Sequence, residues 1–244
     1  MRMKVAADNP RYPEKLDELF RAFGRKVSMS QQIAQVLRTL IVTGDLNPGD
    51  RIVESRVAKQ LGVGQPTVRE ALVQLEHQGL VARKMKQGCV VTVLTREEIS
   101  QICRIRAELE VLAVELAVEN ASDVDIQQLV VQTERMKTAA EARDISDFFT
   151  HDLVFHEILW ELSGNAFLPR ALAPLMLPLL AFLFIRNLRH HSHIDLIESA
   201  AAHMDIVEAI LTRDKEHARK VLQQKLQMFY DQHVNLYEDQ EVRA

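Results

Sequence analysis

The sequence predicts a mainly α-helical protein in which an N-terminal winged helix-turn-helix with a small β-hairpin wing precedes a C-terminal all-α six-helix bundle. Three observations lead to this prediction. Two helical segments flank a glycine-containing turn within residues 54–79. A β-branched run follows at residues 90–93. Beyond residue 95, apolar residues recur at helical spacing without strand-like alternation.

The start of the chain predicts an extension followed by an amphipathic helix. Residues 1–27 are expected to form the extension, with a short helix near 13–23. The helix from Ser28 to Thr43 is predicted because its apolar residues recur every three or four positions (Ile33, Val36, Leu37, Leu40 and Ile41). Turn residues gather at 44–49, before the helix-turn-helix.

The helix-turn-helix pattern is carried by residues 54–79. Its first helix, Glu54–Leu61, ends at Gly62, since glycine adopts a positive φ at little cost. The second begins at Gln65. Pro66 is tolerated in its first turn, because the backbone N–H groups there have no partner within the helix. Such a second helix presents its N-terminal residues to base edges, so we expect DNA contacts from Gln65, Pro66, Thr67 and Arg69. An ordinary helical hairpin is the alternative.

Residues 80–93 and the charge distribution support a nucleic-acid partner. The segment predicts a hairpin with Lys86 at its tip and Gly88 at its turn, placed to contact phosphates or the minor groove. Residues 1–94 contain 15 Lys and Arg against 9 Asp and Glu, whereas residues 95–244 contain 15 against 25. A basic front half suits a polyanion, so double-stranded DNA is expected to bind there and not to the acidic half. We therefore delimit the DNA-binding domain as residues 28–94.

The second domain is expected to span residues 95–240. A capping-box sequence at Thr95–Glu98 predicts a helix that begins there and reaches about residue 119. Five further helices are predicted at residues 123–141, 145–162, 166–189, 195–212 and 215–237.

The remaining composition points to a cytoplasmic protein without a membrane span. The apolar run at 171–185 is too short to cross a bilayer and contains two prolines, so we expect a buried or interfacial helix. The two cysteines, Cys89 and Cys103, lack metal-like spacing and suggest a reducing compartment.

Ionisable residues interrupt the predicted apolar faces of four helices in the second domain. They are Arg106, Glu110, Asp152, His156, His203 and Lys225. A buried charge needs a partner, so these residues together predict a polar cavity inside the bundle. Asp152 and His156 are four residues apart and share one face, and with His203 they could bind Zn²⁺, Ni²⁺ or Mn²⁺. The cluster His190-His191-Ser192-His193 is expected to be a solvated loop.

Both halves resemble one family of bacterial regulators. The front resembles the winged helix-turn-helix of GntR-family repressors through Gly44-x-Leu46-x-Pro48-Gly49 and Val68-Arg69-Glu70-Ala71-Leu72. The back resembles the FCD effector domain of the FadR subfamily through Arg106-x-x-Leu109-Glu110, Asp152-x-x-x-His156 and His203. The resemblance implies a ligand-responsive transcription regulator, not an enzyme. It implies a homodimer on a pseudo-palindromic operator, a small organic-acid effector, and further DNA contacts from Arg38 and Arg56.

The chain departs from the family pattern at two positions. Gln65 replaces an arginine that commonly helps to recognise the operator, so an adenine could be preferred over a guanine. Lys225 replaces a histidine of the metal-binding members, and an ammonium group cannot ligate a metal. Asp152, His156 and His203 could still hold a metal ion. Alternatively, Arg106 and Lys225 would bind an anionic effector without one.

The sequence leaves two alternatives to a ligand-responsive regulator. One is a constitutive DNA-binding regulator whose effector pocket has degenerated, which the Lys225 replacement favours. The other is a metalloenzyme that uses Asp152, His156 and His203. The sequence places no evident general base and nucleophile beside these residues, and an enzyme would leave the DNA-binding front unexplained.

Overall fold

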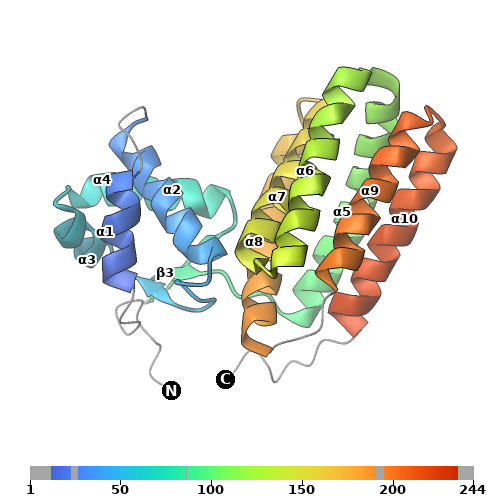
Figure 1. Ribbon diagram of the computed structural model, residues 1–244. Helices are drawn as coiled ribbons and strands as arrows, with labels where there is room; N and C mark the ends of the chain where they lie inside the picture. The colour runs from blue at the N-terminus through green and yellow to red at the C-terminus, as the bar shows by residue number, and fades with distance from the viewer. Residues whose placement is uncertain (1–11, 23–26, 86, 191–194, 236–244) are drawn as a thin grey trace. The chain divides into compact units, whose positions relative to one another are not determined.

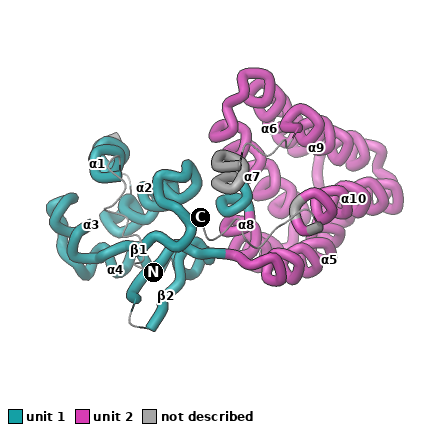
Figure 2. The backbone as a smooth tube through the Cα atoms, turned by 90° about the horizontal axis from the view of Figure 1, so that it is seen from below, with its two compact units in different colours: residues 1–93, 180–186 teal, residues 94–179, 187–244 magenta. Residues whose placement is uncertain are grey.

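The computed structural model describes residues 12–22, 27–85, 87–190 and 195–235. They form ten α-helices, three short strands and a terminal π-helical turn (Figure 1). The chain divides into two compact units, one from residues 1–93 with 180–186 and the other from 94–179 with 187–244 (Figure 2). The mainly α-helical class predicted from the sequence is confirmed.

The described residues up to Val93 in the first unit contain four helices. They are α1 (Tyr12–Ala22), α2 (Met29–Val42), α3 (Glu54–Leu61) and α4 (Gln65–His77). Helix α1 packs against α2 and buries Tyr12 and Leu16, so the predicted N-terminal extension contains a docked helix. Ser28 caps α2 through a capping box with Gln31. The apolar stripe of α2 is buried as its spacing predicts.

The wing belongs to a three-stranded antiparallel sheet. Strands β2 (Val81–Lys84) and β3 (Gly88–Val91) form the predicted hairpin, with Lys84 opposite Gly88. Strand β1 (Arg51–Ile52) pairs with the other edge of β3, which gives the order β1-β3-β2. The sequence did not predict β1, because two residues are too few for an alternating pattern.

The six helices predicted for the bundle follow, and all of them belong to the second unit except residues 180–186 of the fourth. They are α5 (Arg96–Asn120), α6 (Asp123–Ala142), α7 (Ile145–Leu162), α8 (Leu168–His190), α9 (Leu196–Leu211) and α10 (Lys215–Tyr230). Thr95 and Glu98 form the capping box that begins α5. The last predicted helix ends earlier than expected, because α10 passes into a π-helical turn at Asp231–Asn235. Residues 191–193 of the histidine cluster lie outside the described residues.

Helices α5, α6, α7, α9 and α10 pack against one another in the bundle. Helix α6 packs against α7 and α9, while α5 packs against α7 and α10. Trp160 and Phe155 on α7 are fully buried.

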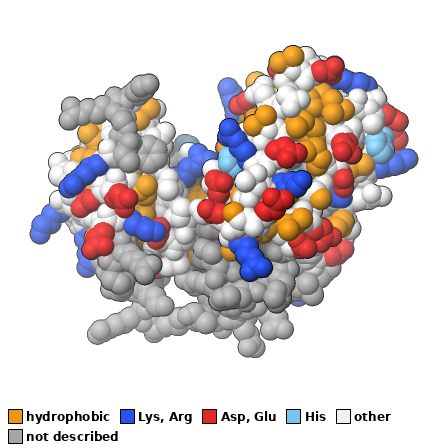
Figure 3. Space-filling view, viewed as in Figure 1, with side chains coloured by type: hydrophobic (Ala, Val, Ile, Leu, Met, Phe, Trp, Pro, Cys, Tyr) orange, Lys and Arg blue, Asp and Glu red, His pale blue; other side chains and the backbone are white. Residues whose placement is uncertain are grey.

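The face seen in Figure 3 carries acidic and basic side chains interspersed with apolar ones. Among the described residues, no helix is long and apolar enough to cross a membrane.

Candidate functional site

The turn between α3 and α4 has the backbone geometry that its glycines predict. Gly62 ends α3 in the left-handed region with a φ of 66°, and Gly64 begins α4 from an extended conformation. Helix α4 buries Val68, Ala71, Leu72 and Leu75 against the rest of the unit. The opposite face of α4 is therefore presented to solvent.

The predicted DNA contacts of α4 lie on or beside this exposed face. Gln65, Pro66 and Arg69 are exposed, and Thr67 is half-buried. Arg69 is not isolated, because its Nε and Nη2 atoms lie 3.1 and 3.0 Å from Oε2 of Glu54 at the start of α3. The hydrogen bond and the charge of Glu54 raise the pKa of the Arg69 guanidinium. Sequence reasoning missed the role of Glu54, since the pair spans two helices.

The other predicted DNA contacts are spread over α2, α3 and the wing. Arg38 on α2 is half-buried and Arg56 on α3 is exposed. Gly88 begins β3 with a φ of 76°, and a Cβ atom there would lie 3.8 Å from Nε of Arg51. Arg51 therefore adds a cation beside the wing that the sequence did not single out. Lys86 lies outside the described residues.

Five of the six ionisable residues predicted to line a cavity come together inside the bundle. Arg106 and Glu110 are contributed by α5, Asp152 and His156 by α7, and His203 by α9. The first four are at most 5 % exposed, and the His203 side chain is 12 % exposed. Asp152, His156 and His203 each offer one ligand atom, and these atoms lie within 4.8 Å of one another.

His203 is placed between two oxygen acceptors. Its Nδ1 lies 2.7 Å from the carbonyl oxygen of Ser199, and its Nε2 lies 2.9 Å from Oδ1 of Asp152. Neither oxygen carries a proton at neutral pH, so both ring nitrogens donate and the imidazole is charged in this arrangement. A metal ion would replace the proton on Nε2, while Nδ1 would keep its bond to Ser199.

His156 has a different environment. Its Nε2 lies 3.4 Å from Nη2 of Arg106, which can only donate, so Nε2 carries the lone pair. Its Nδ1 lies 3.1 Å from Oε1 of Glu110, in a geometry too misaligned for a hydrogen bond. The remaining oxygen of Glu110 accepts from Nε of Arg106 at 2.9 Å. Glu110 therefore neutralises the charge of Arg106 with one oxygen, and its other oxygen lies beside Nδ1 of the His156 ring.

The cluster shifts the ionisation of both its carboxylates in the same direction. Burial alone would raise the pKa of Glu110, but Arg106 and His156 outweigh it and hold the pKa at about 2. Burial likewise opposes ionisation of Asp152, and the hydrogen bond from His203 lowers its pKa below the usual value. Burial lowers the pKa of His203, but the hydrogen bond to Asp152 and the charge of that carboxylate raise it, and the net shift is upward. Both carboxylates are thus charged at neutral pH.

Lys225 is directed elsewhere than the sequence suggested. It lies on α10 with its side chain 23 % exposed, and its Nζ forms an ion pair with Asp205 on α9. Phe229 of α10 does contact the cluster, and its ring centroid lies 4.6 Å from Cζ of Arg106. An aromatic residue on an amphipathic helix gives no signal of such a contact, which is why sequence reasoning missed it.

Besides Nδ1 of His156, two buried donors at the cluster lack a partner among the described residues. Nη1 of Arg106 and Nε1 of Trp160 have no hydrogen-bond acceptor there. An unsatisfied buried donor is costly, so these atoms favour a ligand with acceptor oxygens.

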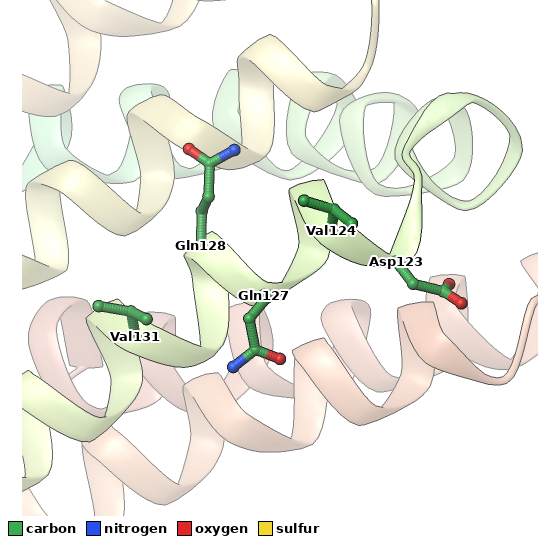
Figure 4. Close-up of a pocket in the computed structure, with 5 residues that line it drawn as sticks. All are labelled: Asp123, Val124, Gln127, Gln128 and Val131. Atoms are coloured by element: carbon green, nitrogen blue, oxygen red, sulfur yellow. The ribbon is translucent and has the colours of Figure 1, made fainter.

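A separate groove on α6 is lined by Asp123, Val124, Gln127, Gln128 and Val131 (Figure 4). Only Asp123 of that lining is ionisable, and it pairs with Arg213.

The winged helix-turn-helix and the helical bundle define a DNA-binding protein of two parts. Residues 29–91 match the family model described as bacterial regulatory proteins of the gntR family. Residues 101–228 match the model of the FCD domain. The chain therefore belongs to the GntR family of bacterial transcription regulators, with an FCD domain, and it is not an enzyme.

Individual relatives agree with this assignment. The uncharacterized regulator YdhC of Bacillus subtilis is 30% identical over 78% of this chain and 84% of its own length. The regulator McbR of Escherichia coli is 28% identical over 86% of this chain and 96% of its own. The solved structure of Escherichia coli McbR/YncC covers 84% of this chain and 99% of its own with a TM-score of 0.71. The gluconate operon repressor of Bacillus subtilis is 27% identical over 90% of each chain.

Proposed function

We propose that this regulator is a repressor that binds a pseudo-palindromic operator as a homodimer in the cytoplasm and responds to a small carboxylate. Relatives named as repressors include the gluconate operon repressor, a probable repressor of D-xylose utilisation, and RspR of Escherichia coli. A dimer would place two α4 helices in successive major grooves, which multiplies a weak single contact. Exposure of Gln65 and Arg69 at the start of α4 supports the DNA contact.

The ligand set of the bundle fits a divalent metal ion. Asp152, His156 and His203 supply a carboxylate and two imidazoles, a mixture suited to Zn²⁺, Ni²⁺ or Mn²⁺. Nδ1 of His203 donates to the carbonyl oxygen of Ser199, as metal-binding histidines commonly do with the ring nitrogen that does not bind the metal. Nδ1 of His156 lies 3.1 Å from Oε1 of Glu110 without forming such a bond. When bound, the ion would supply an open coordination position for a carboxylate oxygen.

The effector site is proposed to include Arg106 and, less directly, Lys225. The single observation that carries the proposal is the buried Nη1 of Arg106, which lacks an acceptor among the described residues. A carboxylate bound there would satisfy this donor and add a charge-assisted hydrogen bond. Lys225 would have to leave Asp205 before it could contribute.

The response to the effector requires two arrangements of the protein with different affinities for it. A ligand shifts such an equilibrium only by its differential affinity for the two states. The alternative is a constitutive regulator without an effector. The ion pair between Lys225 and Asp205 favours it, because a paired ammonium group is less available to bind a ligand.

Elemental analysis of protein purified without chelator or affinity metal tests the metal site. We expect about one equivalent of Zn, Ni or Mn per chain. A His203→Ala variant should lose it, whereas His217→Ala, which alters an exposed histidine of α10, should retain it. If the wild-type protein contains no metal, the proposed metal site is wrong, and Arg106 would be the centre of an anion-binding site.

Thermal unfolding in the presence of small organic acids tests the effector site. A carboxylate that binds the folded state raises the unfolding temperature, and an Arg106→Lys variant should lose this response. The operator should be released at the same ligand concentration. A protein that no organic acid stabilises would favour the constitutive alternative.

A further inference from the structure

We propose that Glu54 is a positioning residue that sets sequence specificity by holding the Arg69 guanidinium for contact with a guanine. The inference rests on DNA binding by the exposed face of α4. Glu54 is the first residue of α3, and Arg69 lies one turn into α4. The turn at Gly62 brings the N-terminal ends of α3 and α4 together. The ion pair between Glu54 and Arg69 therefore depends on the geometry of the helix-turn-helix.

The contact uses one edge of the guanidinium and leaves the other edge available. Glu54 Oε2 lies 3.1 Å from Nε and 3.0 Å from Nη2 of Arg69, so it occupies the edge formed by these two nitrogens. A guanidinium has five N–H groups. Both N–H groups of Nη1 and the second of Nη2 are therefore left, and this outer edge matches O6 and N7 of guanine.

Arg69 would otherwise be poorly ordered. Its side chain is 58% exposed, whereas that of Glu54 is only 22% exposed and sits in the first turn of a short helix. An exposed arginine loses rotamer freedom when it binds a base. Because Glu54 restricts that freedom before DNA arrives, less of it remains to be lost in the complex.

The charge of Glu54 acts in the same direction on specificity. A carboxylate at the DNA surface repels phosphates, and so it weakens binding that depends on the backbone alone. It strengthens the base contact through Arg69. Both effects increase the ratio of specific to non-specific affinity, which an ion pair with a purely structural role would leave unchanged.

The test uses the full chain and a duplex selected from random sequences by the wild-type protein. Its affinity is compared with that of a scrambled duplex of equal composition, in wild type and in Glu54→Gln. Glutamine keeps the length and one acceptor but removes the charge. We expect the affinity ratio to fall about tenfold, with tighter binding of the scrambled duplex. The matched control is Glu76→Gln, which breaks the exposed pair between Glu76 and Arg83 at 3.2 Å and should change the ratio by less than about twofold.

A double-mutant cycle separates positioning from a general effect on folding. If Glu54 acts mainly through Arg69, Glu54→Gln should change the ratio by less than about twofold in an Arg69→Ala background, where only its repulsion of phosphates is left. An unchanged ratio in Glu54→Gln, or an equal loss in the Arg69→Ala background, would overturn the proposal. A wild-type protein that prefers no duplex would overturn DNA recognition as well, so the two failures are distinguishable.

Discussion

The guanidinium of Arg106 is buried only because Glu110 lies one helical turn away on α5. The two side chains are 6% and 0% exposed, and Nε of Arg106 donates to Glu110 at 2.9 Å. Removing one partner of a buried ion pair leaves an uncompensated charge, which costs much more than the pair itself contributes. The stability of the polar cluster therefore depends on both residues together.

A Glu110→Gln variant should lose about 3 kcal/mol of unfolding free energy, because it leaves Arg106 buried without a counter-charge. The control is Glu119→Gln on the same helix, which breaks the exposed pair with Lys215 and should cost less than about 1 kcal/mol. Urea unfolding of both variants measures the difference. Equal losses would mean that burial does not distinguish the two pairs.

The acid sensitivity of the bundle should also depend on Glu110. Its folded pKa of about 2 lies below the ordinary value of 4.5, so the stabilisation is complete above pH 4.5 and is lost as pH falls toward 2. In Glu110→Gln, the unfolding free energy should therefore decline less between pH 5 and about 3 than in wild type. Unfolding curves across this range provide the measurement, and parallel pH profiles would contradict the assignment.

Individual residues were predictable where periodicity alone decides burial. Arg106, Asp152 and His156 fall on apolar faces, and the structure buries them. Their partners were not predictable, because a helical face does not specify which side chain on the neighbouring helix it meets. Lys225 illustrates this, since a shared apolar face suggested the cluster and the structure pairs it with Asp205.

Among the elements, the turn between α3 and α4 depends on one residue in the left-handed region. A Cβ atom added at Gly62 would meet nothing within 4 Å, so a substitution there acts through the backbone alone. Gly62→Ala should destabilise the first unit by about 1–2 kcal/mol. Gly62→Asn should cost less, because asparagine tolerates this conformation. Thermal unfolding of both variants measures the effect, and similar losses would show that φ is not its cause.

The element boundaries followed from caps and periodicity. Thr95 begins α5 through its capping box, and Gly62 ends α3 with a φ of 66°, both as their local sequence predicts. Strand β1 was missed because its two residues are defined by pairing with β3, far along the chain. Local signals specify helices well and specify a short edge strand hardly at all.

For the whole molecule, the basic charge of the first 94 residues predicts where salt dependence arises. Arg56→Ala removes an exposed cation of α3, so binding should weaken on all duplexes alike and the log–log salt slope should fall by about 1. Lys137→Ala removes an exposed cation of α6 and should leave the slope unchanged. Fluorescence anisotropy at several salt concentrations measures both slopes. A slope altered equally by Lys137→Ala would place phosphate contacts on the bundle.

The sequence by itself determined the helical faces, the helix-turn-helix and the ionisable residues that those faces would bury. These properties are local, since they depend on spacings of three or four residues and on single turn residues. Only the tertiary structure decided the pairs: Glu54 with Arg69, His203 with Asp152, and Lys225 with Asp205. The members of each pair lie on different helices, and the packing of those helices fixes which charges meet.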